Sequence, residues 1–377
     1  AAETARLGRI YMPFDAIDDV LPLQIETVTK GLFSGNTGSL VNMFTSSNLT
    51  ATQKTYYQEV FSVADPGNSP SGTSELSIAY GHFAGSGSRD LTGNLNNDTP
   101  TRAIYKQYAQ ILLAPNDKKF TFNGTDSDSI YILNFNRARM REKIDPGNFE
   151  LTMGILSGSA GVKNSNGLGF SNAGHTGSAV RLNGLAQWIK VIDDSSTNSA
   201  DIGESGQVYN LISGSIDGGT SIFNAASPVY YGLLYPQHGI AILNGDTLDA
   251  NVGFETVSGS LVQGDNAVKL FKSLSGSNMI VPNTQTGGIQ ARSSEQVKST
   301  YYFVRIKNGE FNYSNNPTFT TGSLGEMAFN SFIQDPQIYV TTVGLFNVKR
   351  ELLAVAKLSQ PLLKNFTREA LIKVKLD

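Results

Sequence analysis

Residues 370–377 read ALIKVKLD, in which apolar and charged side chains alternate. Such alternation is typical of a β-strand with one face in a core and the other in solvent. The expected inward side chains are Ile372, Val374 and Leu376, and the expected outward ones are Lys373 and Lys375. Three more strand patterns precede this one: TYYFVRIKNGEFNY (300–313), QIYVTTVGLF (337–346) and ELLAVAKL (351–358). The residues NVKR (347–350) between the last two predict a hairpin turn.

The composition places the whole chain in the same class. With 377 residues it is long enough for a sizeable core and for more than one domain. It holds 38 Gly, 20 Phe and 15 Tyr, which favours strands joined by many turns. We therefore expect a mainly β fold with a few short helices (α+β), built from antiparallel, β-sandwich-like sheets.

Charge and cysteine content exclude several classes of protein. A net charge of −3 argues against a dedicated nucleic-acid binder, which needs a basic surface to displace counterions. The absence of cysteine excludes disulfides, thiolate metal sites and cysteine nucleophiles. No apolar run approaches the ~20 residues that cross a bilayer. The opening AAETAR (1–6) is not followed by the apolar segment of a signal peptide. We expect neither a nucleic-acid nor a membrane partner.

The distribution of charge predicts a division into two parts. Only six of the 29 Lys and Arg residues lie between Gly154 and Glu295, a stretch rich in Gly, Ser and Asn. Within this stretch, an apolar residue is followed by Ser-Gly-Ser four times, which is typical of turns and strand ends. We expect residues 1–150 and 296–377 to form an α+β anchoring domain and residues 151–295 to form a Gly/Ser-rich β domain inserted into it.

Two helices are expected in the first part. Thr50 and Gln53 have the spacing of a capping box, which predicts a helix through Tyr57, Val60 and Phe61. A second helix is predicted from Pro100 to about Leu113, with Thr99 as N-cap. Its expected apolar face consists of Ile104, Tyr108, Ile111 and Leu112. Strands are expected at 120–122, 129–141 and 149–153, with a turn at 145–148.

The one polar feature that stands out is a run of cations. Arg137, Arg139, Arg141 and Lys143 are spaced two apart, so a strand would carry all four on one face. Arginine forms forked bonds to carboxylates, which makes this run a possible interaction surface for an acidic neighbour. It could equally be a solvated face that protects a sheet edge from unwanted pairing.

The sequence contains no set of residues that defines a catalytic centre. His82, His175 and His238 lack metal-ligand spacing, and residues 85–90 (GSGSRD) match no phosphate-binding loop. Asp126 and Asp128 lack the later glycine and glutamate of a calcium loop and are read as a polar turn. A glycosidase pair remains open, since the separation of two carboxylates depends on the fold. Its candidates are Asp193, Asp194, Asp246, Asp249 and Glu255. We assign no catalytic, cofactor-binding or metal residue and expect no cofactor.

Several segments resemble virion structural proteins of contractile-tailed bacteriophages, namely T-even-type phages and their marine relatives. The resemblance is densest in RIKNGEFNYSNNPTF (305–319), YVTTVGLFN (339–347), LLAVAKLSQP (352–361) and the final ALIKVKLD. Upstream it includes AIYKQYA (103–109), RARMREKIDPGN (137–148) and YYGLLYP (230–236).

This resemblance implies a non-enzymatic structural subunit, most plausibly a wedge-type component of the tail baseplate. The implied partners are other virion structural proteins in a multi-copy, symmetric or homo-oligomeric assembly, formed in the host cytoplasm and located in the phage tail. Two alternatives of the same kind are a neck protein and a head-decoration protein. A receptor- or glycan-binding tail module is a third, with Trp188, Tyr230, Tyr231 and Tyr235 as the aromatic residues that would meet a sugar. A polysaccharide-cleaving tail enzyme is the fourth.

Overall fold

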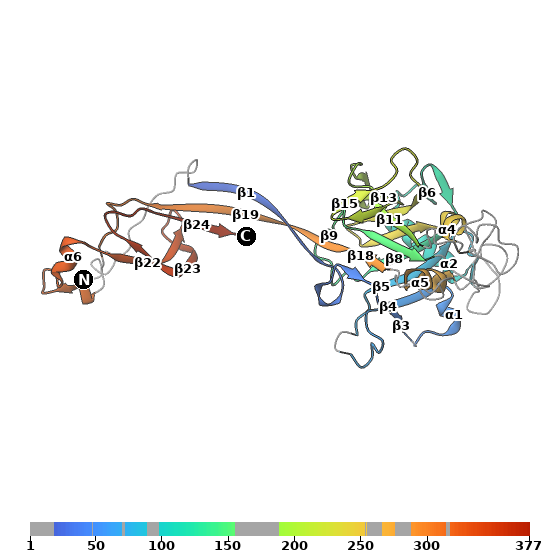
Figure 1. Ribbon diagram of the computed structural model, residues 1–377, viewed down its shortest axis with the longest axis horizontal. Helices are drawn as coiled ribbons and strands as arrows, with labels where there is room; N and C mark the ends of the chain where they lie inside the picture. The colour runs from blue at the N-terminus through green and yellow to red at the C-terminus, as the bar shows by residue number, and fades with distance from the viewer. Residues whose placement is uncertain are drawn as a thin grey trace. The chain divides into compact units, whose positions relative to one another are not determined.

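The computed structural model describes residues 19–46, 48–69, 72–88, 98–154, 188–252, 254, 266–275, 288–313 and 317–377. In these residues the protein is mainly β, with a few short helices, as the sequence predicts (Figure 1). The strand pairs within the sheets are antiparallel.

The chain divides into two compact units. The smaller unit comprises Ala1–Thr27 with Gln296–Asp377, and the larger unit comprises Val28–Glu295. Strand β1 (Val20–Gly31) carries the chain from the smaller unit into the larger, and β19 (Arg292–Ile306) carries it back. The two units meet at residues 295/296, which is also a border of the domains predicted from the charge distribution. No border occurs at residue 150, because the residues on both sides of it belong to one sheet.

That sheet is the framework of the larger unit. Its strands follow the order β2-β18-β10-β11-β13-β16-β17-β8-β5-β4-β3, and β12 pairs with β13. Their bounds are β2 Ser39–Leu40, β3 Phe44–Thr45, β4 Tyr57–Phe61, β5 Leu76–His82, β8 Ser129–Phe135, β10 Glu150–Gly154, β11 Trp188–Asp193, β12 Asp201–Gly203, β13 Gly206–Ser213, β16 Tyr230–Tyr235, β17 Ile240–Asn244 and β18 Gly288–Gln290. Short pieces complete this unit: 3₁₀ helix Ser34–Asn36, β6 Phe120–Phe122, β7 Thr125–Ser127, β9 Lys143–Ile144, β14 Ser215–Asp217 and β15 Thr220–Ile222.

The centre of the sheet is covered on both faces. Strand β8 sends Ile130 and Ile132 into one hydrophobic cluster and Tyr131 and Leu133 into another, as the two-residue period of a strand requires. The first cluster is closed by α2 (Pro100–Leu112). The second is closed by α4 (Gly245–Val252) and α5 (Asn266–Ser275). Sheets covered in this way contain strands that are apolar at successive positions, as β17 is.

The first predicted helix is confirmed only at its start. The capping box forms, with the Gln53 amide donating to Thr50 Oγ1 at 3.3 Å, but helix α1 spans only Ala51–Lys54. The expected continuation through Tyr57, Val60 and Phe61 is wrong. These residues form β4, where pairing with β3 and β5 buries Val60 and Phe61.

Helix α2 is confirmed, with Pro100 in its first turn. Of the predicted apolar face, Leu112 is buried, and Ile104 and Tyr108 pack partly buried against the same cluster. The other buried residues of the helix are Thr101, Tyr105 and Ala109. Ile111 is 46% exposed. Thr99 does not cap the helix with its side chain; its Oγ1 donates to the Gly85 carbonyl at 2.5 Å.

The smaller unit contains the four C-terminal strand patterns. Strands β1, β19 and β24 (Ala370–Leu376) form one sheet, and β22 (Ile338–Phe346) and β23 (Leu352–Lys364) form a hairpin. The predicted turn is present, since the Arg350 amide donates to the Asn347 carbonyl at 2.9 Å. Ile372 and Val374 point into a core shared with Ile306, Val343 and Leu345, while Lys373 and Lys375 are exposed. The unit also contains the 3₁₀ helix Pro317–Phe319, β20 Thr320–Thr321, β21 Glu326–Met327 and α6 Asn330–Gln334.

Candidate interaction surfaces

The predicted cationic strand face does not form. Strand β8 ends at Phe135, so Arg137, Arg139 and Arg141 lie in the connection to β9, and Lys143 opens β9. The physical cause is Asn136, whose side-chain oxygen accepts from the Ala138 amide at 3.0 Å and whose carbonyl accepts from the Arg139 amide at 3.1 Å. Asparagine stabilises turns in this way and ends the strand.

Each of the four cations contacts a different residue of the larger unit. Arg137 donates to the Gln237 carbonyl, and Arg141 forms an ion pair with Glu295. Lys143 Nζ donates to Gln207 Oε1 at 3.0 Å. The contact of these charges with an acidic neighbour stays a prediction.

Arg139 is held by a buried carboxylate. Its guanidinium lies 3.0 Å from Glu75, whose side chain is inaccessible to solvent, and donates to Ser34 Oγ and Thr73 Oγ1, each at 2.6 Å. Glu75 also accepts from the Ser34 amide and from Ser62 Oγ at 2.7 Å. A buried carboxylate needs such partners, so Arg139 stabilises the larger unit.

The histidines within the described residues do not come together. His82 is buried in β5, and its Nδ1 accepts from the Ala84 amide at 3.2 Å; burial lowers its pKa, which favours the neutral ring. His238 Nε2 lies 3.0 Å from the Ser205 carbonyl, and His175 lies outside the described residues. In the part of the chain that the structure describes, no group of three or more His, Cys, Asp or Glu is arranged to hold a metal ion.

Two carboxylates considered for a glycosidase pair, Asp193 and Asp194, accept hydrogen bonds from backbone amides. Asp193 accepts from the Gly147 amide at 2.9 Å, and Asp194 from the Asn210 amide at 2.9 Å. Burial is the largest influence on Asp193 and raises its pKa. Asp246 and Asp249 lie on α4, and Glu255 lies outside the described residues.

The predicted polar turn is wrong for Asp126, which lies in strand β7 opposite Thr121 of β6, while Asp128 lies in the bend between β7 and β8. Asp126 accepts from Thr121 Oγ1 at 2.8 Å, and Asp128 pairs with Lys119 at 2.7 Å. In the other candidate loop, Gly85 and Gly87 have positive φ, and Arg89 and Asp90 lie outside the described residues.

The aromatic residues considered for glycan binding include two that are not available at the surface. Tyr231 is 3% exposed and Tyr235 is 2% exposed, because both pack into the cores of the large sheet. Tyr230 is half-buried, and the side chain of Trp188 lies outside the described part.

Exposed apolar side chains gather in the smaller unit. It carries fifteen of the 22 exposed large hydrophobic residues found in the described chain: Leu21, Leu23, Ile25, Tyr313, Leu324, Phe329, Ile333, Tyr339, Val348, Leu352, Leu353, Val355, Leu362, Phe366 and Leu371. This surface was not predicted from the sequence. Its signal is ELLAVAKL, which is apolar at both odd and even positions, a pattern of strands covered on both faces.

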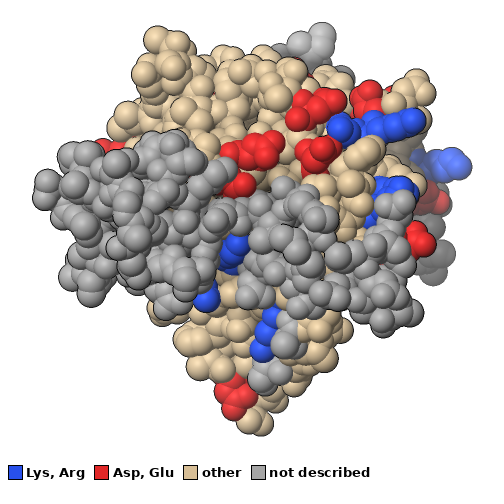
Figure 2. All heavy atoms as spheres, turned by 90° about the vertical axis from the view of Figure 1, so that its right-hand side faces the viewer, with Lys and Arg blue, Asp and Glu red and all other residues tan. Residues whose placement is uncertain are grey.

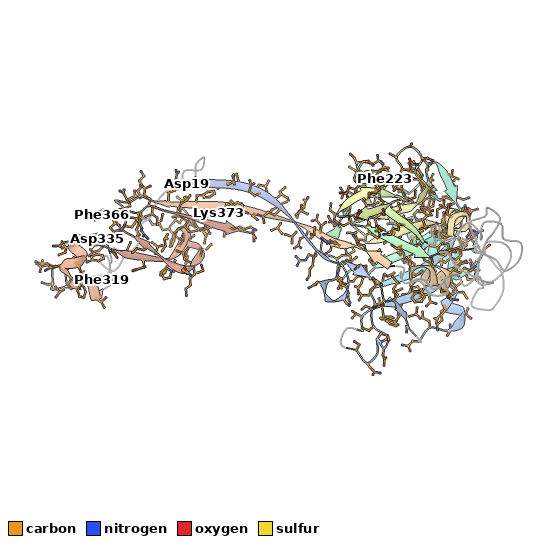
Figure 3. The ribbon with its side chains drawn as sticks, viewed as in Figure 1. Asp19, Phe223, Phe319, Asp335, Phe366 and Lys373 are labelled. Carbon is orange, nitrogen blue, oxygen red and sulfur yellow. The ribbon has the colours of Figure 1, made fainter. Side chains whose placement is uncertain are left out.

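The charged residues of the β1–β19–β24 sheet pair with one another. Tyr301 donates to Glu26 Oε1 at 2.6 Å, Lys375 donates to Glu26 Oε2 at 2.9 Å, and Arg305 pairs with Asp19 at 2.7 Å. Lys373 Nζ lies 3.7 Å above the Tyr301 ring. Figure 3 labels Asp19 and Lys373 on this sheet. These charged side chains of the sheet are therefore already paired within the unit.

Charge is mixed on the face of the molecule that Figure 2 shows. Among the described residues on this face, acidic and basic side chains both occur between uncharged ones, and neither sign forms a continuous area. That distribution is unlike the basic stripe of a nucleic-acid site. None of the described helices has the length and apolar character needed to cross a membrane.

Comparison of the chain with protein-family models, with curated proteins and with solved structures gives no match.

Proposed function

We propose that this protein is a structural, non-enzymatic subunit of a phage virion, a wedge-type component of the tail baseplate that joins its neighbours through the smaller unit. The observation that carries the proposal is the concentration of exposed apolar side chains in that unit. Soluble monomers rarely expose contiguous apolar patches of large area, and such patches mark surfaces that another molecule covers.

The small core of this unit supports the same function. Its buried apolar side chains are Ile306, Val343, Leu345, Ala370, Ile372 and Val374, and each retains between 5% and 9% exposure. The large sheet contains many side chains with no exposure at all. A unit with so small a core gains stability when a partner covers it.

The sequence resemblance supports the identity of the assembly. Its densest segments, from residue 305 to residue 377, fall within the smaller unit. The densest part of the resemblance thus lies in the unit that carries most of the exposed apolar side chains.

The test is the position and copy number of this chain in an imaged particle, by cryo-electron microscopy with a tag inserted at Gly218-Gly219, an exposed turn between β14 and β15. Sixfold symmetry, or a multiple of it, at the tail end agrees with a baseplate subunit. A position at the neck or on the head would show that the protein is a neck or a head-decoration protein and not a baseplate subunit. Absence from the particle would overturn the proposal.

A further inference from the structure

One edge of the β22–β23 hairpin is a candidate for pairing with another strand. Strand β23 pairs with β22 along one edge, with Gly344 opposite Val355 and Leu345 opposite Ala354. Within the described residues, no strand pairs with the other edge of β23 (Figure 1). An open strand edge presents unpaired amide and carbonyl groups on which a further strand can add.

The first seven residues of β23 have the composition of a pairing segment. Residues 352–358 read LLAVAKL, with one charge and neither proline nor glycine. The inward side chains Ala354, Ala356 and Leu358 pack against the core of the unit. On the outer face, Leu353 is 67% exposed and Val355 is 57% exposed. Prolines and breaks in register protect natural edges. In β23, Pro361 and the break opposite Val340–Thr342 come after this segment, and a second break, opposite Leu345–Phe346, falls at its start.

We propose that a second copy of this chain covers this edge. Residues 352–358 of two copies would pair antiparallel about a two-fold axis at Val355, joining two hairpins into one four-stranded sheet. This proposal rests on the proposed function and names the partner of its apolar surface. Two-fold pairing of identical surfaces is the commonest symmetry of homo-oligomers.

The segment is complementary to itself in this arrangement. Antiparallel pairing about Val355 places Val355 opposite its own copy, and Ala354 opposite Ala356 of the second copy. Lys357 then lies opposite Leu353, where its aliphatic stem covers the leucine.

Charge selects the antiparallel direction. The lysines of the two copies are then offset by four residues, about 14 Å along the strand. A parallel pairing in register would place them directly opposite each other, which is unfavourable for like charges.

A single introduced cysteine tests the register, because the natural chain has none. In the proposed pair the two Cβ atoms at position 355 lie about 4.5–5.5 Å apart. That is near the spacing of a disulfide, so Val355→Cys should form a disulfide-linked dimer on mild oxidation. Leu371→Cys and Ile202→Cys are matched controls at positions 62% and 87% exposed, outside the proposed pair, and should give little dimer.

The native association is measured by light scattering across a concentration series, with the full chain. The wild type should be dimeric, and Val355→Lys, which places two lysines opposite each other, should weaken the dimer at least tenfold. Leu371→Lys is the control and should leave it unchanged. If Val355→Lys does not fold, the cysteine variant still tests the pairing.

Several results would overturn this proposal. The proposal is wrong if the wild type stays monomeric and Val355→Cys gives no specific disulfide-linked dimer. It is also wrong if Leu371→Cys cross-links as readily as Val355→Cys. If the chain is monomeric and binds a different tail protein through β23, that protein and not a second copy is the partner of this edge. In these cases the baseplate function stands if the chain is still found at the tail end of the particle.

Discussion

The buried ion pair of Glu75 and Arg139 shows how a single residue can be read wrongly from spacing alone. Arg139 belongs to a regular run of cations, yet its side chain is 20% exposed and its partner is fully buried. Glu75 lies 64 positions earlier in the sequence, just before β5, so no local pattern connects the two. Only the fold brings them together.

Replacing Glu75 by glutamine should therefore destabilise the larger unit. Breaking a fully buried pair costs about 3–5 kcal/mol, and the partial exposure of Arg139 reduces the expected loss to about 2–3 kcal/mol. Urea-induced unfolding followed by circular dichroism measures this loss. Glu204→Gln, at an exposed position, is the matched control and should change the unfolding free energy by less than about 0.5 kcal/mol. Equal midpoints for the two variants would contradict the structural role of Glu75.

A second residue-scale prediction concerns Glu26 and pH. Its hydrogen bond from Tyr301, together with Lys375, holds the pKa of Glu26 below its ordinary value of 4.5. A lowered pKa means that the folded state favours the charged form. The contribution of this carboxylate to folding is therefore complete above its ordinary pKa and is lost as the pH falls through the lowered value.

In Tyr301→Phe the largest cause of this shift is removed, so the pKa of Glu26 should rise toward 4.5. Carboxyl-carbon NMR titration of the wild type and the variant measures the change. Tyr339→Phe, in a side chain that is 62% exposed, should leave the titration of Glu26 where it is in the wild type. A rise of equal size in both variants would refute the assigned cause.

At the scale of elements, strand β24 is the element that the sequence predicts best. Its residues alternate between buried and exposed positions, and a two-residue period is a local property that a single strand reveals. Helix α2 was also predictable from a local signal, because Pro100 favours the first turn of a helix. The burial of Tyr105 was not predictable, because its ring packs against Phe83 and Phe120, which lie elsewhere in the chain.

The elements that were predicted wrongly are those that distant partners decide. Residues 57–61 follow a true capping box but pair with β5, and the energy of that pairing exceeds the preference of a short helix. The cationic stretch fails through Asn136, whose side chain forms a turn where a continued strand was expected. A hydrogen bond between neighbouring residues therefore ends β8 earlier than predicted. Pairing between distant residues forms strand β4 where a helix was predicted.

Two adjacent residues of β24 provide a matched test of its alternation. Ile372 is 6% exposed and Leu371 is 62% exposed. Ile372→Ala should lower the stability of the smaller unit by about 2–4 kcal/mol, since it removes buried methyl groups. Leu371→Ala should cost less than about 0.5 kcal/mol. Thermal melting of the smaller unit, followed by NMR signals of its own residues, separates the two, and similar losses would contradict the assigned faces.

Removing residues 370–377 extends this test to the whole strand. The deletion takes Ile372, Val374 and Leu376 from the core, at about 1.5–3 kcal/mol for each fully buried side chain. We expect the smaller unit to unfold. A soluble truncated protein that melts like the wild type would refute this expectation.

At the scale of the whole molecule, the division into units follows hydrogen bonding more closely than composition. The shift in charge near residue 154 lies inside a sheet, where β10 pairs with both β11 and β18. The exposed apolar surface of the β22–β23 hairpin was likewise not predictable from local sequence. The strands of the hairpin were predictable, but whether their outer faces are covered depends on the rest of the fold.

A fragment of residues 28–295 should fold by itself, because all twelve strands of the large sheet lie within it. Its circular dichroism and its NMR spectrum should reproduce the signals of the larger unit in the full chain. A fragment of residues 1–150 should not fold, since it lacks β11, β13, β16 and β17 of the same sheet and serves as the control. An unfolded 28–295 fragment would show that the larger unit depends on the smaller one.

The two strands that cross the border between the units have a consequence for proteolysis. The chain crosses from one unit to the other twice, once within β1 and once within β19. A protease that cuts one of these connections leaves the units covalently joined through the other. Release of the smaller unit thus requires two independent cuts and should begin only after a lag, as in any two-hit process. After a first nick the two units therefore remain one covalently connected molecule.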